Sequence, residues 1–280
     1  MIIALFPSEK KKDALPLAGE IAKFLMQHSV MVIAEEGVAP ILKVPPISSV
    51  EPNKIDFLIC IGGDGTILRL SHRYRELKAA ILGINLGYLG FMADIPLCDI
   101  YPSLQDLLNG DYKIENRIML DGMLPDGKSY HAANDIVLHR GKNHSLIEIS
   151  LHIDTVYVNT FIADGLIIAT PNGSTAYSLS AGGPILSPKI PSFVITPICP
   201  HTISNRPIVI SSDATLQLHY LSRYDNPAEV HIDGTEHLSL NTQEKIILKQ
   251  SRHFFKLVKL KRHDFFSTLR TKLNWSGKSK

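Results

Sequence analysis

The segment Gly62-Gly63-Asp64-Gly65-Thr66 has the residue types of a site that handles phosphate or hydroxyl groups. It follows an apolar run and precedes a helix-like stretch. Glycines permit a sharp turn and a close approach of a ligand to the backbone amides, and a helix N-terminus offers unpaired N–H groups to an anion. The Asp64 charge repels phosphate unless a metal ion or a substrate hydroxyl lies between them. The alternative is a glycine turn in which Asp64 caps the helix.

A second candidate segment, residues 164–177, joins an apolar run to a Pro-Asn-Gly turn. The turn delivers Ser174 and Thr175 to the start of a predicted helix, where their hydroxyls and the free amides suit a ligand. The alternative is an ordinary capped helix after a strand.

Two smaller patches carry further polar groups. Asn134-Asp135 interrupts the apolar run from Ala132 to Leu138. A buried polar pair needs partners, which a site, a bulge or a turn can supply. Residues 85–91 place two glycines beside aromatic rings, which suits a planar ligand, but a plain loop with core aromatics fits equally.

The elements that must position these patches fall into two groups. Residues 1–116 alternate apolar strand-like runs with helix-like stretches, and the continuous run Ile55 to Ile61 is typical of a strand buried on both faces. Strand, glycine turn, helix and strand predict an α/β domain with a parallel sheet. From 117 to 258 strand-like pieces follow one another, among them 130–138, 245–250 and 254–260, with one short helix near Ser174. We expect a β-rich, β-sandwich-like second domain there, and a tail over 259–280.

Composition excludes several classes of function. The 280 residues have a formal net charge of +2 and ordinary globular usage, with 45% hydrophobic and 20% charged residues. No basic face or arm for nucleic acid precedes the last twenty residues, and no apolar run approaches the ~20 residues that span a bilayer. The three widely spaced cysteines favour buried thiols over disulfides or a metal site. We therefore expect a cytoplasmic enzyme with no nucleic-acid or membrane partner.

Residues 122–129 match the P-loop pattern G-x-x-x-x-G-K-[ST] letter for letter. A working P-loop follows a buried strand and opens a helix. Here Pro125-Asp126-Gly127 is a strong turn signal, and Ser129 leads into another strand-like run. We predict a β-hairpin tip with Lys128 in solvent.

Taken together, the motifs closely resemble the NAD kinase family over nearly the whole chain. The match covers 62–66, the Asn-x-Gly-x-Leu-Gly-Phe loop at 85–91, the Asn-acidic pair at 134–135, Asp164-Gly165, 173–177, Pro200-His201, 205–207 and 271–275. Gly-Gly-Asp-Gly-Thr alone is shared with lipid kinases and loosely with phosphofructokinases, whereas Gly-Ser-Thr-Ala-Tyr joined to it is far more specific.

The resemblance implies transfer of the γ-phosphate of ATP to the 2′-hydroxyl of the adenosine ribose of NAD. Asp64 is then the catalytic base. The implied binding residues are Gly65, Arg69, Phe91, Asn134, Asp135, Asp164, Thr175, Ala176, Tyr177, Ser178, Leu179 and Ser180. The resemblance also implies Mg²⁺ or another divalent cation, bound to ATP rather than to a set of protein ligands. It implies a homodimer or homotetramer with sites built across subunits. The tail over 259–280 is then expected to pack back on the first domain.

The sequence departs from the family pattern at four positions. Asp135 stands where Glu is usual, Asn172 where Thr or Ser is usual, Ile162 where a basic residue is common, and Thr235 where Gln is typical. These departures put the contacts at 135, 162 and 235 in question but leave the reaction intact.

Two alternative functions share part of the pattern. A diacylglycerol-type lipid kinase shares the glycine–Asp turn, but no exposed amphipathic stretch or basic cluster suggests membrane binding. A non-catalytic NAD-binding sensor is the second alternative, in which Asp64 has no evident purpose.

Overall fold

The structure is a computed structural model that describes residues 1–222 and 226–275. The chain forms two compact units, Met1–Asn116 with Lys256–Lys280 as unit 1 and Arg117–Phe255 as unit 2. Residues 276–280 of the expected tail lie outside the described residues. The strands β5 (Tyr112–Met123) and β16 (Lys245–Leu260) both run from one unit into the other.

Unit 1 is built on a parallel sheet in the order β2-β1-β3-β4. Its strands are β1 (Ile2–Pro7), β2 (Met31–Ala34), β3 (Phe57–Gly62) and β4 (Ala80–Asn85). Every residue of β3 and β4 is buried, which is why their sequences are apolar throughout rather than alternating. The C-terminal half of β16 adds a parallel neighbour to β4, with Leu257 opposite Ile81.

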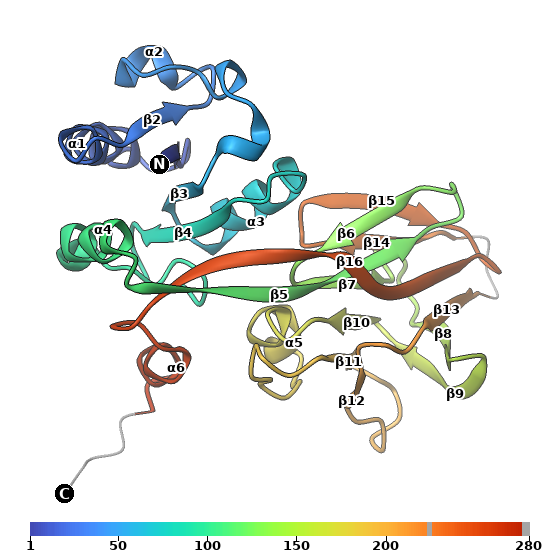
Figure 1. Cartoon of the computed structure of the whole chain (residues 1–280). Helices are drawn as coiled ribbons and strands as arrows, with labels where there is room; N and C mark the ends of the chain where they lie inside the picture. The colour runs from blue at the N-terminus through green and yellow to red at the C-terminus, as the bar shows by residue number, and fades with distance from the viewer. Residues whose placement is uncertain (223–225, 276–280) are drawn as a thin grey trace, which may run out of the picture. The chain divides into compact units, whose positions relative to one another are not determined.

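Helices cover both faces of this sheet (Figure 1). The described helices of unit 1 are α1 (Ala14–Gln27), α2 (Ala39–Leu42), α3 (Asp64–Arg73), α4 (Ile100–Asn109) and α6 (Phe265–Lys272), with 3-10 turns at Ile47–Ser49, Pro52–Lys54 and Leu97–Asp99. Helices α1 and α4 share one core with Leu82 and Ile84 of β4. Ile67 of α3 approaches Gly83, which faces the other way on that strand. Helix α3 therefore covers the opposite face.

The carboxyl ends of β1, β3 and β4 lie at one edge of the sheet because these strands are parallel and adjacent. The loops that leave this edge are 8–13, the glycine turn at 62–63, and 86–94. Ligands of open α/β sheets bind at this edge.

Unit 2 is antiparallel and holds most of its core between two sheets (Figure 1). The strands of one sheet are, in spatial order, β12 (Ile208–Ser211), β11 (Ser192–Ile198), β10 (Gly165–Ala169), β7 (Asp135–His139), β14 (Ala228–Ile232) and β15 (Glu236–Leu240). The other strands are β5, β6 (Ser129–Ala132), β8 (Ile147–Ile153), β9 (Val156–Ala163), β13 (Leu216–Leu221) and the first half of β16. Leu138 and Ile168 from the first group share a core with Ile149 and Leu218 from the second. The expected fold class, an α/β domain followed by a β-rich domain, is confirmed.

The structure corrects two expected strands. The strand expected over 130–138 is two strands, β6 and β7, separated by a bend at Ala133 and Asn134. The strands expected at 245–250 and 254–260 are one, β16. The polar residues between them look like a break, but backbone pairing with β5, rather than side-chain type, carries the strand through.

The predicted hairpin at residues 122–129 is confirmed. Residues 124–128 turn between β5 and β6, Gly127 has φ 76°, and the Leu124 N–H donates to the Lys128 carbonyl at 3.3 Å. Asp126 accepts the Lys128 N–H at 2.9 Å. Because no helix follows, this segment has none of the geometry of a P-loop.

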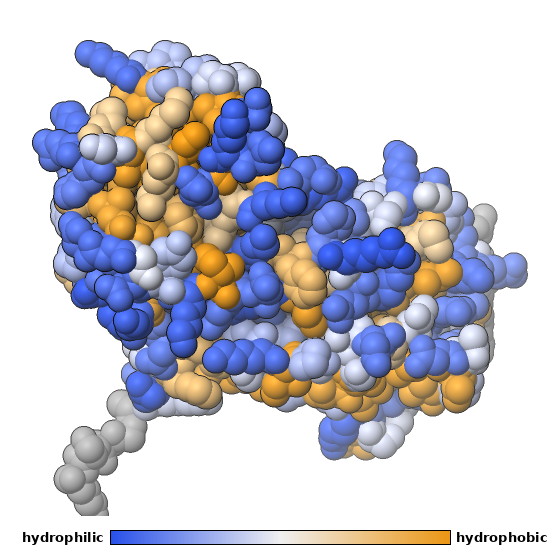
Figure 2. Space-filling view, in the orientation of Figure 1, coloured by the Kyte–Doolittle hydropathy of each residue, from blue (hydrophilic) through white to orange (hydrophobic). Residues whose placement is uncertain are grey.

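Figure 2 shows hydrophilic residues interspersed with apolar ones over the visible face. Within the described part of the chain, no helix has the length and apolarity to cross a membrane.

Candidate functional site

Asp64 begins α3, but its carboxylate does not cap that helix. Instead it accepts three consecutive backbone N–H groups from the loop after β4, those of Phe91 at 2.8 Å, Met92 at 3.1 Å and Ala93 at 2.9 Å. The alternative of a helix cap is therefore wrong. Asp64 joins the glycine turn after β3 to the loop after β4, at the carboxyl edge of the sheet.

Gly90 makes room for this arrangement. A Cβ at this position would lie 2.0 Å from Asp64 Oδ1, closer than atoms can approach without a shift. The Gly90 N–H also donates to the Ala93 carbonyl at 2.9 Å and closes a turn around the carboxylate. The second glycine of the 85–91 motif is thus required by Asp64 rather than by a planar ligand.

The hydrogen bonds leave Asp64 one acceptor position. Each carboxylate oxygen has two lone pairs. Oδ1 accepts from Met92 and Ala93, whereas Oδ2 accepts only from Phe91 among the described residues. Oδ2 therefore has a lone pair that can take a hydrogen bond, and then a proton, from a hydroxyl group.

Lys11 lies beside the glycine turn and was missed by the sequence analysis. Its ammonium donates to the Gly62 carbonyl at 3.1 Å and to the Leu86 carbonyl. With Lys12 and Gly87 it lines a hollow of about 600 Å³. The signal was present as three consecutive lysines after the first strand, but such a run is usually a solvated surface loop. Arg69 and Gly65 are exposed on α3.

Asn134 and Asp135 lie where β6 bends into β7, and a second aspartate fixes them. The Asp233 carboxylate accepts the N–H groups of Ala133 at 2.8 Å, Asn134 at 2.8 Å and Asp135 at 3.0 Å. Asn172 donates through Nδ2 to Asn134 Oδ1 at 2.6 Å. The polar pair thus sits at a bend, where both backbone N–H groups and the Asn134 side chain have hydrogen-bond partners.

A hollow of about 440 Å³ in unit 2 brings several predicted residues together. Asn134, Asp135, Ala176, Tyr177, Val137, His139, His231, Asp233 and Gly234 line it. Burial, and to a lesser extent the nearby Asp233 charge, together raise the pKa of Asp135 to about 7. A carboxyl group that is partly neutral near pH 7 can donate as well as accept a hydrogen bond.

His139 and His231 were not predicted to line this hollow. They project from neighbouring strands with ring centroids 6.3 Å apart, and His237 lies 4.5 Å from His231. Burial and then the nearby His237 lower the pKa of His231, with Glu229 opposing the shift. The sequence signal is the spacing along each strand: His139 is four residues after Asp135, and Asp233 is two residues after His231. Because side chains alternate with a period of two, this spacing puts all four on the face of the sheet that lines the hollow.

The predicted binding residues 175–180 begin at the last residue of a 3-10 turn, Gly173–Thr175, and end with the short helix α5, Tyr177–Ser180. Gly173 is required because a Cβ there would lie 2.1 Å from the Asn134 carbonyl oxygen. The Thr175 hydroxyl donates to the Asn172 carbonyl at 3.0 Å, and the buried Ser178 hydroxyl pairs with Thr196 at 2.8 Å. These hydroxyls are therefore engaged by the protein itself.

The remaining predicted residues lie outside the hollow. Asp164 pairs with Arg140, whose Nε lies 2.6 Å from Asp164 Oδ1. Leu179 is half-buried and Ser180 is exposed. The Phe91 ring lies against Phe265, with centroids 6.1 Å apart. No three His, Cys, Asp or Glu side chains of the described residues are placed to hold a metal ion together.

Two family models match the chain, one in each part of the sequence. The model of the ATP-NAD kinase N-terminal domain matches residues 3–112, and that of the ATP-NAD kinase C-terminal domain matches residues 133–260. An NAD kinase of Protochlamydia amoebophila is 51% identical over 279 residues that cover 100% of both chains, and one of Geotalea daltonii is 35% identical over 98% of both.

Two solved structures share the fold. The yeast NADH kinase complexed with NADH has a TM-score of 0.87 and 26% identity, with 100% of this chain and 89% of that chain covered. The NAD kinase from Archaeoglobus fulgidus in complex with ATP has a TM-score of 0.76 and 26% identity, with 99% and 100% covered. The full-length match goes against the lipid-kinase and sensor alternatives. The chain therefore belongs to the NAD kinase family and is an enzyme that phosphorylates NAD.

Proposed function

We propose that Asp64 accepts the proton of the 2′-hydroxyl on the adenosine ribose of NAD while that oxygen takes the γ-phosphate of ATP. The observation that carries this assignment is the arrangement of the Asp64 carboxylate. Three backbone N–H groups hold it in one orientation, and one lone pair of Oδ2 remains for a hydroxyl.

The reaction forms a bond between the 2′-oxygen and the γ-phosphorus and breaks the bond from that phosphorus to the bridging oxygen of ADP. Phosphoryl transfer has a loose transition state, so positioning and charge neutralisation dominate. A carboxylate is a weak base, and the hydroxyl becomes acidic only as its oxygen bonds to phosphorus. Asp64 therefore orients the hydroxyl first and receives the proton late.

The hollow in unit 2 is proposed to hold the dinucleotide. Asn134 and Asp135 offer amide and carboxyl groups to ribose hydroxyls, and the exposed ring of Tyr177 offers a stacking surface. Asp233 supports this role because it fixes the backbone on which Asn134 and Asp135 stand. Asp164 and Ser178 are bonded to Arg140 and Thr196, which do not line the hollow.

Lys11 is proposed to contact the ATP phosphates. Two carbonyl oxygens hold its ammonium at the glycine turn, and an ammonium has three N–H donors. Mg²⁺ enters as part of the Mg·ATP substrate and neutralises phosphate charge. The cytoplasmic location expected from the composition and the homodimer or homotetramer implied by the resemblance stay predictions.

The test is to incubate the purified full chain with ATP, Mg²⁺ and NAD and to detect NADP with an NADP-specific dehydrogenase. Omission of ATP and replacement of NAD by NADP are the controls. Binding of NAD by calorimetry without formation of NADP would contradict the proposal and favour a non-catalytic sensor.

A further inference from the structure

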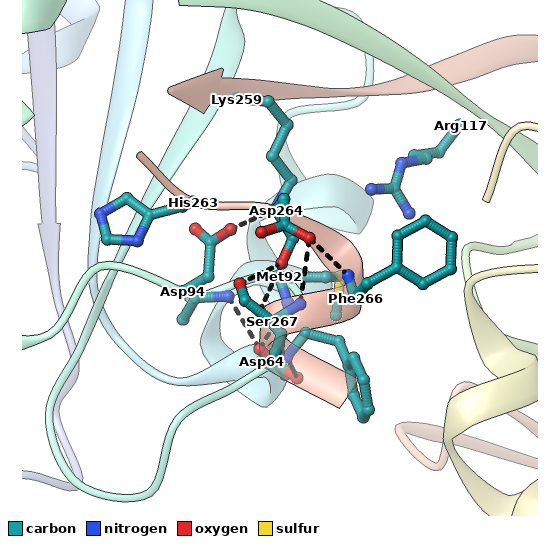
Figure 3. A network of polar contacts seen from close by, with 12 residues as sticks. Asp64, Met92, Asp94, Arg117, Lys259, His263, Asp264, Phe266 and Ser267 are labelled. Atoms are coloured by element: carbon teal, nitrogen blue, oxygen red, sulfur yellow. Dashed lines mark hydrogen bonds and ion pairs between the residues drawn. The ribbon is translucent and has the colours of Figure 1, made fainter. Parts of the chain in front are cut away.

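Residues 259–272, near the end of the described chain, contact the loop whose backbone N–H groups at 91–93 donate to Asp64. We propose that Lys259 and Phe265 are positioning residues for the phosphoryl transfer, acting through the backbone N–H groups of Phe91, Met92 and Ala93. This inference rests on the proposed role of Asp64. Figure 3 shows Asp64 and Met92 close to Asp94, Lys259 and the start of α6.

Lys259 holds one end of the loop. It forms an ion pair with Asp94, the residue directly after Ala93, and the two side chains are only 11% and 6% exposed. Two charges leave water at a high cost, which is offset only while each has the other. Removal of the lysine leaves a buried carboxylate without this partner and favours movement of the Asp94 backbone toward water.

Phe265 holds the other end. Its ring contacts the ring of Phe91 with centroids 6.1 Å apart, and Lys272 of the same helix places Nζ 4.6 Å from the Phe91 ring centroid. The first of the three N–H donors belongs to Phe91 itself. The aromatic contact and the cation–π contact therefore fix the residue that donates to Oδ2.

Helix α6 is itself held in place by a capping residue and by the hydrogen bonds of Arg262. Asp264 caps its N-terminus and accepts the N–H groups of Phe266 at 2.9 Å and Ser267 at 3.0 Å. Arg262, just before the helix, donates to Asp106 at 2.8 Å and to Asp99 at 3.1 Å. The support thus joins α4, α6 and the 91–94 loop within unit 1.

The loop needs such a support because its own sequence does not fix it. Gly87 has φ 131° and Gly90 has no side chain, so the segment before Phe91 has wide backbone freedom. Misplacement of a reacting group by about 1 Å can cost about a hundredfold in rate. Loss of either contact should therefore lower kcat while substrate binding persists.

The first test compares Lys259→Met with Lys261→Met. Lys261 lies two residues further along the same segment and pairs with Asp111 on the surface, where the side chains are 75% and 52% exposed. We expect Lys259→Met to lower kcat at least threefold, with KM for NAD and for ATP within a factor of three of wild type, and Lys261→Met to leave all three values within a factor of two. A folded Lys259→Met that keeps kcat within a factor of three overturns the inference, as does a larger change in either KM than in kcat.

A double variant separates positioning from direct action of the ammonium. Asp94→Leu with Lys259→Met replaces the buried pair by apolar side chains, which proteins often tolerate. We expect kcat to return to within a factor of three of wild type. If the double variant stays as slow as Lys259→Met, the Lys259 charge itself takes part in the reaction, and its assignment as a positioning residue is wrong.

The second test does not depend on Lys259→Met and therefore applies even if that variant fails to fold. Phe265→Ala removes the ring against Phe91, whereas Phe266→Ala removes the adjacent ring, which is 62% exposed and contacts Phe265 instead. We expect a kcat loss of threefold or more for Phe265→Ala and of less than twofold for Phe266→Ala. Equal effects of the two variants overturn the inference. Wild-type protein that makes no NADP would contradict the proposed function itself, and the variants would then not be needed.

Discussion

Two aspartates, one in each unit, each accept hydrogen bonds from three consecutive backbone N–H groups. Asp64 accepts the N–H groups of residues 91–93, and Asp233 accepts those of residues 133–135. An ionised carboxylate only accepts hydrogen bonds, and bonds from N–H groups to a charged acceptor are stronger than neutral ones. Each aspartate therefore fixes three successive residues of a loop beside a candidate site. Asp64 and the pair Asn134-Asp135 derive their geometry from these bonds.

Asp64→Asn should lower turnover by about 10² to 10⁴-fold, which is the usual contribution of a positioned general base. Affinity for NAD, measured by calorimetry, should stay within about threefold. The asparagine also presents an N–H₂ group to one of the backbone N–H donors, so we expect a loss of about 1 to 3 kcal/mol of unfolding free energy. Initial rates, calorimetry and urea unfolding separate the three effects. Turnover within threefold of wild type would contradict the assignment.

The Asp135 carboxyl group should make the stability of the protein depend on pH. Its pKa is raised to about 7, first by burial and then by Asp233, from about 3.9 in an unfolded chain. Between these values the folded state keeps a proton that the unfolded state has lost. The free energy of unfolding therefore falls as pH rises from about 4 to 7 and is level above 7.

Asp135→Asn removes this dependence. At about 1.4 kcal/mol per pKa unit, wild type should lose on the order of 2 kcal/mol more than the variant between pH 5 and pH 8. Urea unfolding at both pH values measures the difference, and Asp213→Asn, at an exposed position, is the control. Parallel pH curves for wild type and Asp135→Asn would show that this carboxyl group titrates normally.

At the scale of elements, the strand that precedes a glycine-rich motif decides whether the motif can form a phosphate-binding turn. The two motifs to compare are those at 62–65 and 122–129. The turn at 62–65 follows a buried parallel strand and begins a helix, so its amides and Asp64 lie at the carboxyl edge of a sheet. The P-loop pattern at 122–129 joins two antiparallel strands. Its glycine serves the turn and not a phosphate.

Lys128→Ala should accordingly change kcat/KM for ATP by less than a factor of about two to three, because its side chain is exposed at a hairpin tip. Steady-state kinetics with varied ATP measure this, and Lys11→Ala serves as the contrasting variant, with a rise in KM for ATP expected. A hundredfold loss in Lys128→Ala, with an unchanged circular dichroism spectrum, would place the phosphates at 122–129.

At the scale of the whole molecule, the chain builds unit 1 from its two ends and unit 2 from its middle. The residues that line the hollow proposed to hold the dinucleotide all belong to unit 2. NAD alone should therefore slow amide hydrogen exchange most at 133–139, 173–180 and 231–234, because a ligand stabilises the states that bind it. Helix α1 of unit 1 is the internal control. Protection confined to unit 1 would show that the hollow has been wrongly assigned.

The sequence by itself determined the two fold classes and, through its resemblance to the NAD kinase family, the reaction. Apolar runs such as Ile55 to Ile61 are local signals of a strand buried on both faces, and turn residues such as Pro125-Asp126-Gly127 mark a hairpin wherever they lie. The motif residues Asp64, Asn134 and Tyr177 were identified because their types and local spacing are themselves the signal.

Only the tertiary structure decided what those residues touch. Asp64 and Ala93 are 29 positions apart, Asn134 and Asp233 are 99 apart, and Lys259 and Asp94 are 165 apart. Such contacts depend on strand order and on the return of the chain end to unit 1, and no window of local sequence contains both partners. For the same reason the sequence did not single out Lys11, and it could not decide whether a site, a bulge or a turn satisfies Asn134 and Asp135, which lie at a bend held by Asp233.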